Sequence, residues 1–207
     1  MSARLLDRDQ FLTRWSELHG GYDPRTGSVL VRGWLGLVVL LAAPLRRLHP
    51  HVLTGLGVAV AGFACWTAGF APWLAALVVL VSALFDGLDG AVAVLTRRES
   101  RFGFVLDSVA DRVADGLFLV ALWRAGAGPG ACVAAGAAVA MLEYGRARAA
   151  AAGLDEIGVV TVGERPIRVA VTVLALCCAP AAGAWALLAL GIVGLVQLLV
   201  VVRRRLV

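Results

Sequence analysis

Two apolar stretches of this chain read SALFDGLDGAVAV over residues 82–94 and GFVLDSVADRVAD over residues 103–115. Together they place five aspartates in hydrophobic sequence: Asp86, Asp89, Asp107, Asp111 and Asp115. A carboxylate at the centre of a membrane costs roughly 2.5–3.5 kcal/mol on insertion scales. Such a concentration of acids indicates a compensating partner, and bound metal is the partner we expect.

The overall composition is that of an integral membrane protein. Of 207 residues, 60% are hydrophobic, well above the roughly 45–50% of soluble domains. We predict an all-α membrane domain over residues 50–207, preceded by an N-terminal segment, residues 1–49. Within that segment we expect an amphipathic helix at 4–19 and an apolar, interfacial juxtamembrane helix at 29–48.

Six transmembrane helices are predicted in the membrane domain, at residues 52–70, 73–95, 103–123, 129–147, 166–181 and 185–202. Arginines concentrate at both chain ends and in the second and fourth connecting loops, whereas the other three loops carry only Arg124. The positive-inside rule therefore places the arginine-rich loops and both termini in the cytoplasm. We predict a multi-pass protein of the cell (inner or plasma) membrane whose acidic residues face the cytoplasm.

Helical spacing brings the acids together in pairs. Asp86 and Asp89 are spaced i,i+3, and Asp107 and Asp111 are spaced i,i+4, so each pair shares a helix face. Two such pairs could hold one or two Mg²⁺, Mn²⁺ or Ca²⁺ ions, which polarise a pyrophosphate, while a carboxylate outside the metal shell acts as general base. The alternative is that the acids pair with Arg112 and other arginines. We favour metal, because these spans hold five acids and one arginine.

The motif DxxDGxxA at residues 86–93, followed after nine residues by GxxxDxxxD at 103–111, resembles the signature of the CDP-alcohol phosphotransferases. The resemblance covers residues 50–205. It implies a metal-dependent transferase of phospholipid biosynthesis, which moves a phosphatidyl-type group from CDP-diacylglycerol to an alcohol and releases CMP. We further predict a homodimer in the lipid bilayer, without a nucleic-acid partner.

The resemblance also implies roles for individual residues. The metal, Mg²⁺ or Mn²⁺, would be held at the donor pyrophosphate by the carboxylates of Asp86, Asp89, Asp107 and Asp111. Asp111 would also be the base that acts on the acceptor hydroxyl. The donor CDP group would contact Thr54, Gly90 and Ala93. We expect Gly87 and Gly90 to keep this helix face bare, so that a ligand can approach the backbone.

Two positions depart from the family pattern. The signature arginine that follows Ala93 is Val94 here, and the asparagine that precedes the first span is His51. Both family positions lie near the donor nucleotide, so a non-catalytic member of the family is one alternative. A second alternative is a cation transporter, since acids within membranes often mark ion paths. Against a transporter, the acids cluster at one depth, with only Arg124 near the outer side.

Arginines also gather at the predicted cytoplasmic ends of the fourth and fifth spans. They lie in EYGRARA at residues 143–149 and in GERPIR at 163–168. Together they could form a pocket that binds an anion. The alternative is that they only reflect the positive-inside rule. The arrangement is similar to that of actinobacterial phosphatidylinositol phosphate synthases. The acceptor-binding residues so implied are Arg146, Arg148 and Arg165. Val162 replaces one further expected arginine. Either Arg168 substitutes for it and binds a phosphorylated acceptor, such as inositol phosphate, or the acceptor is an alcohol without phosphate.

Overall fold

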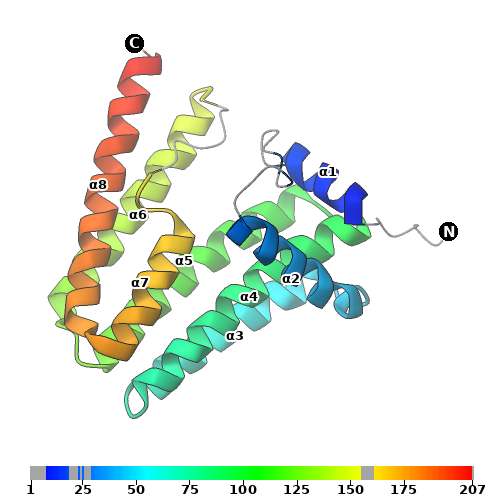
Figure 1. The fold of residues 1–207 in the computed structure, drawn as a ribbon. Coiled ribbons are helices and arrows are strands. Elements are labelled where there is room, and N and C mark those ends of the chain that lie inside the picture. Colours follow the sequence, from blue (N-terminus) through cyan, green and yellow to red (C-terminus); the bar gives the residue numbers. More distant parts are fainter. Residues whose placement is uncertain (1–7, 19–22, 24, 26–28, 155–160, 207) are drawn as a thin grey trace. The chain divides into compact units, whose positions relative to one another are not determined.

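The computed structural model of the chain consists of α-helices (Figure 1). It describes residues 8–18, 23, 25, 29–154 and 161–206. The described helices are α1 (Arg8–Leu18), α2 (Val29–Leu45), α3 (Pro50–Ala68), α4 (Pro72–Thr96), α5 (Arg101–Arg124), α6 (Pro129–Ala151), α7 (Arg165–Cys178) and α8 (Pro180–Leu206). Each predicted helix therefore has a counterpart, and of the predicted N-terminal helix residues 4–7 and 19 lie outside the described residues.

Proline and glycine positions explain where these helices begin and end. Helices α3, α4, α6 and α8 each begin at a proline, which suits the first turn because its missing N–H would have no helical partner there. Helices α5 and α6 are followed by Gly126 and Gly153, at φ values of +107° and +94°, as in Schellman caps. The same cap ends α4, but there the residue with positive φ, +54°, is Arg97.

Three of the described helices, α3, α4 and α8, are long and apolar enough to cross a membrane. Helices α5 and α6 have 24 and 23 residues but carry several charges, and α7 has 14 residues. The apolar part of α2, Arg32–Leu45, is also short for a span. The structure thus supports a helical membrane protein, while the number of six spans remains a prediction.

The chain divides into two compact units. The first comprises Met1–Val58 with Ser82–Asp111, and the second comprises Ala59–Val81 with Arg112–Val207. In the second unit, α6 and α8 run side by side (Figure 1). The first unit holds four of the five aspartates, and the second holds the arginines of α6 and α7. The predicted boundary at residue 49 remains a prediction.

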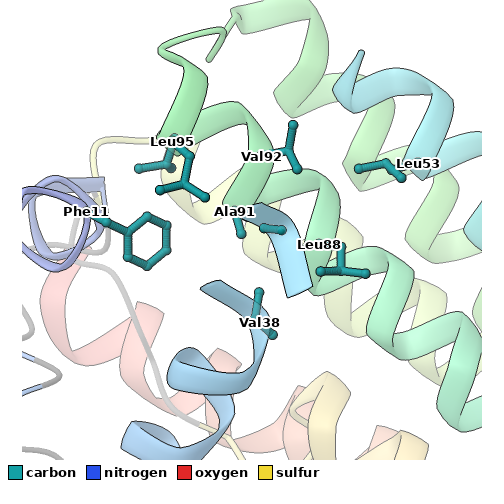
Figure 2. Close-up of a cluster of buried hydrophobic side chains, with 9 residues drawn as sticks. Phe11, Val38, Leu53, Leu88, Ala91, Val92 and Leu95 are labelled. Carbon is teal, nitrogen blue, oxygen red and sulfur yellow. The ribbon is translucent and has the colours of Figure 1, made fainter. Parts of the chain in front are cut away.

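A core of buried apolar residues joins α1, α2, α3 and α4 within the first unit (Figure 2). Phe11 of α1 is 1% exposed and lies in this core with Val38, Leu53 and Leu95. The apolar face of the predicted amphipathic helix therefore packs against protein. An ion pair of 3.1 Å between Arg14 and Glu99 also ties α1 to the connector between α4 and α5.

Candidate active site

Three of the predicted metal ligands lie together in the first unit. Asp86 of α4 and Asp107 and Asp111 of α5 each offer a carboxylate oxygen, and these oxygens all lie within 4.8 Å of one another. The three side chains are partly buried. Hard divalent cations take carboxylate oxygen ligands from several residues, so the chemistry and the spacing of this group fit such an ion.

Asp89, the fourth predicted ligand, lies one turn along α4 from Asp86 and is only 5% exposed. Its Oδ2 accepts a hydrogen bond from the Thr54 hydroxyl of α3, with an oxygen–oxygen distance of 2.5 Å. Thr54 is itself buried. A buried carboxylate requires such donors, because losing water without replacement is costly. Thr54 therefore orients Asp89 beside the acidic cluster.

Gly87 and Gly90, which lie beside the aspartates of α4, differ in their surroundings. A Cβ atom on Gly90 would meet nothing within 4 Å, so this position is open. A Cβ on Gly87 would lie 3.3 Å from the ring of Trp34 on α2. Gly90 therefore leaves the helix face bare as expected, whereas for Gly87 that expectation is wrong, because the close approach of α2 uses the space.

The second unit contains a buried network of ion pairs. Arg168 of α7 is 3% exposed, and it donates hydrogen bonds of 2.9 Å to Asp115 and 2.9 Å to Glu143. It also donates to the backbone carbonyl of Gly163. Arg112 lies 3.4 Å from Asp115 and 3.0 Å from Glu143. These two acids and two arginines neutralise one another, which a buried charge needs in order to be stable.

Arg146 of α6 continues this network to the beginning of α7. Its Nη2 donates to Glu164 at 2.5 Å and to the Thr161 hydroxyl at 2.6 Å, and its Nη1 lies 3.5 Å from Glu143. Arg165 joins at the edge, with its Nε 3.9 Å from Asp115. Four arginines and three acids thus meet within this described network.

A cavity of about 90 Å³ adjoins the network among α5, α6, α7 and α8. Arg112, Asp115 and Arg168 form its charged wall with the hydroxyl of Thr172, and apolar residues and glycines line the rest. The volume suffices for several water molecules, each of which needs about 10–15 Å³ by this measure. The buried ion pairs therefore border a space that ligand groups or water can enter.

Comparison with known sequences identifies the family. The sequence model for CDP-alcohol phosphatidyltransferases matches residues 47–202, which is most of the chain. The chain belongs to the CDP-alcohol phosphatidyltransferase family. This finding confirms the family and the enzyme class that the aspartate motif predicts. The matched region contains both the acidic cluster and the arginine network.

Several relatives of this chain are named as synthases of archaetidylinositol phosphate or phosphatidylinositol phosphate. An archaetidylinositol phosphate synthase of Aeropyrum pernix is 33% identical over 135 residues, covering 62% of this chain and 69% of the relative. A phosphatidylinositol phosphate synthase of Mycobacteroides abscessus is 35% identical over 139 residues, covering 62% of each chain. The chain therefore spans less than two thirds of this second relative.

Two solved structures of the Mycobacterium tuberculosis phosphatidylinositol phosphate synthase PgsA1 share the fold. The complex with manganese and citrate has a TM-score of 0.67 and 30% identity, covering 80% of this chain and 88% of that one. The structure with CDP-DAG bound has a TM-score of 0.66 and 29% identity, covering 80% and 92%. The family therefore includes relatives of this fold with a divalent metal and with a CDP-linked lipid.

The structure accommodates both departures from the family signature within the first unit. Val94 is 5% exposed and belongs to the apolar core of Figure 2, so a valine is well suited to this position. His51 lies in the first turn of α3, where its ring contacts Phe102 edge-on with centroids 5.3 Å apart. A Cβ on Gly103 would lie 3.2 Å from the His51 ring, so the signature glycine makes room for this histidine.

The predicted acceptor residues differ in their surroundings. Arg146, Arg165 and Arg168 all belong to the ion-pair network, whereas Arg148 is exposed and none of the described ion pairs includes it. Sequence reasoning did not find that Glu143 and Glu164 pair with these arginines. A signal was present, since Glu143 precedes Arg146 by three residues, the spacing of ion pairs on one helix face. The alternative that Arg112 neutralises an acid is correct for Asp115.

Proposed function

We propose that this chain transfers a phosphatidyl-type group from CDP-diacylglycerol to an alcohol and releases CMP. The observation that carries the proposal is the convergence of Asp86, Asp107 and Asp111 oxygens within 4.8 Å, at the positions of the family motif. The structure of a relative with CDP-DAG bound supports the choice of donor. The polar substrate groups would reach the site from the cytoplasm, where the arginine-rich loops are expected.

Four carboxylates would hold Mg²⁺ or Mn²⁺: Asp86, Asp89, Asp107 and Asp111. When bound, the metal supplies Lewis-acid polarisation of the donor pyrophosphate. The acceptor oxygen attacks the phosphorus that carries the lipid, the bond from that phosphorus to the CMP oxygen breaks, and the hydroxyl proton passes to Asp111. Thr54 would keep the Asp89 carboxylate in position, because its hydroxyl donates to Asp89.

The CDP group would lie beside Thr54, Gly90 and Ala93. The open space at the Gly90 Cβ position supports this placement, because a ligand can then lie against the backbone of α4. Ala93 is one turn further along the same helix and only partly buried. His51, one turn before Thr54 on α3, would border the same nucleotide in place of the family asparagine.

The acceptor would be a phosphorylated alcohol of the inositol phosphate type, bound by Arg146, Arg148, Arg165 and Arg168. The names of the relatives support this class. The gathering of Arg146, Arg165 and Arg168 in one network supports it too, because arginine forks bind phosphate well. The active protein would be a homodimer of six-span chains in the cell membrane.

The direct test is an assay of CMP release by the full chain purified in detergent. Mg²⁺ or Mn²⁺ and CDP-diacylglycerol are supplied, and inositol phosphate is compared with inositol and with other alcohols. We expect CMP release that requires metal and is fastest with inositol phosphate. A chain that binds metal but releases no CMP with any acceptor would be a non-catalytic member of the family, and the proposal would be wrong.

A further inference from the structure

The three acids of the ion-pair network differ in their exposure and in the number of arginines that they contact. Asp115 and Glu143 each lie within 4 Å of three arginines in the described part of the chain, and their side chains are 10% and 17% exposed. Glu164 is 33% exposed and pairs with a single described arginine, Arg146. It also accepts a backbone hydrogen bond of 3.1 Å from Thr161. Glu164 is therefore the acid that an incoming anion can displace most easily.

Displacing the other two acids would strand a buried charge. Arg168 depends on both Asp115 and Glu143, and breaking one half of a buried pair typically costs about 3–5 kcal/mol. Arg146 is 25% exposed and keeps Glu143 at 3.5 Å when Glu164 moves away. The side chains of the Arg146–Glu164 pair are 25% and 33% exposed, more than those of the Arg168 pairs, so water can solvate a separated Glu164. Exchange of the Glu164 carboxylate for another anion therefore leaves the ion pairs of Arg168 and Arg112 in place, and an oxygen of the new anion can accept the Thr161 N–H.

We propose that Glu164 is a specificity-determining residue, whose carboxylate occupies the anion position on Arg146 until an acceptor phosphate replaces it. This inference rests on the proposed function. A phosphate with two negative charges and several oxygens competes well with one carboxylate, because it forms more charge-assisted hydrogen bonds. A singly charged or neutral compound competes poorly. Glu164 thereby selects phosphorylated acceptors over others that fit the same space.

After the exchange, the released carboxylate of Glu164 also has a favourable place to go. Glu164 is the residue that immediately precedes α7, and its side chain makes no capping hydrogen bond to that helix. The N-terminal end of a helix attracts negative charge. The released carboxylate can therefore stay beside the beginning of α7, so the exchange does not require the acid to move far.

The test compares phosphate binding by five versions of the full chain: the parent, three single variants and one double variant. Glu164→Gln removes the competing charge and should bind inorganic phosphate about tenfold more tightly than the parent, because one charge-assisted contact becomes available. Thr161→Ala removes a neutral partner of the same Arg146 nitrogen and should not tighten binding. In Arg146→Gln protein, adding Glu164→Gln should have no effect. Calorimetric titration in the presence of Mg²⁺ measures these affinities. Phosphate that binds at the acidic cluster instead would be recognised because its affinity does not depend on Arg146.

The inference is overturned if Glu164→Gln leaves the phosphate affinity unchanged, or if it tightens binding equally with and without Arg146. Should Glu164→Gln not fold, Glu164→Asp shortens the side chain by one methylene and should tighten binding several-fold; unchanged affinity would again overturn the inference. The binding readout is separate from turnover. If the parent releases no CMP with inositol phosphate, the proposed function is wrong. The phosphate affinities of the Glu164 and Arg146 variants still show whether phosphate replaces the Glu164 carboxylate on Arg146.

Discussion

The hydroxyl of Thr54 donates a hydrogen bond of 2.5 Å to the carboxylate of Asp89, joining α3 to α4. Both side chains are buried, so water cannot replace this donor. We expect Thr54→Val to destabilise the protein by about 1–3 kcal/mol, because a buried acceptor loses its partner. CMP release should fall as well, since Asp89 loses its orientation. Chemical unfolding in detergent and the CMP assay measure the two effects.

Thr54→Ser is the matched control, because it keeps the hydroxyl and removes only a methyl group. It should retain most of the stability and activity. Equal losses in the serine and valine variants would mean that packing of the threonine methyl matters and that the hydrogen bond to Asp89 does not.

Asp111→Asn should keep the fold and metal binding but lose most of its turnover. The asparagine side chain can still offer an oxygen to a metal but cannot accept the acceptor proton, and general-base contributions are about 10²–10⁴-fold. CMP release under saturating metal measures the effect. The control is Asp9→Asn on α1, whose side chain is 88% exposed. Near-parental turnover of Asp111→Asn would refute the role of base.

Asp107→Asn and Asp89→Asn should each weaken Mg²⁺ or Mn²⁺ binding. Hard cations depend on the total charge of their ligands, and each change removes one negative charge. Titration with Mn²⁺, followed by magnetic resonance of the free ion, gives the affinities. Titration curves that overlay the parent would show that these carboxylates are not ligands.

Two arginines of α7 should respond in different ways to substitution. Arg168→Gln leaves Asp115 and Glu143 without their buried partner and should reduce stability by about 3–5 kcal/mol. Arg165→Ala removes a residue at the edge of the network, 16% exposed, and should mainly raise the KM for the acceptor. The loss corresponds to about 1.5–3 kcal/mol of acceptor binding, with CDP-donor affinity unchanged.

The control for both arginines is Arg203→Ala, at the exposed end of α8. It should alter neither unfolding nor the acceptor KM. If Arg165→Ala leaves the KM of inositol phosphate unchanged and a neutral alcohol is the better acceptor, the arginines do not bind a phosphate.

The connector between α4 and α5 should face the cytoplasm. Ser100 is exposed in this connector, beside Arg97 and Arg98, so the positive-inside rule assigns it to that side. On a background without the four native cysteines, Ser100→Cys should react with an impermeant thiol reagent only in inside-out vesicles. If the reagent labels Ser100→Cys in intact cells and not in inside-out vesicles, the connector faces the outside and the predicted topology is wrong.

Most of the fold could be predicted from hydrophobic segments and their proline boundaries. Each predicted helix has a counterpart because a run of apolar residues ending in glycine or beginning with proline leaves the backbone few alternatives. The packing of Phe11 in a protein core could not be predicted. An amphipathic helix has the same pattern whether its apolar face lies on lipid or on protein.

The acidic cluster was predictable because its spacing is local. Asp107 and Asp111 are one turn apart on one helix, and their motif fixes the family. The pairing of Arg168 with Asp115 and Glu143 was not predictable, because it depends on side chains 53 and 25 residues distant along the chain. Similarly, the sequence does not reveal that Gly87 accommodates Trp34 while Gly90 stays open.

The charge network has a consequence for how the protein is made. Arg112 and Asp115 pair within α5, and Glu143 and Arg146 pair within α6. Arg168 of α7, in contrast, meets Asp115 and Glu143 only when the three helices are assembled. Alone, α7 would expose the charge of Arg168 to lipid during insertion, which is costly, whereas α3, α4 and α8 are apolar enough to enter independently. We expect α5, α6 and α7 to enter the membrane together. A substitution that removes one of these ion pairs should therefore lower the amount of protein in the membrane more than it lowers the activity of the protein that is inserted.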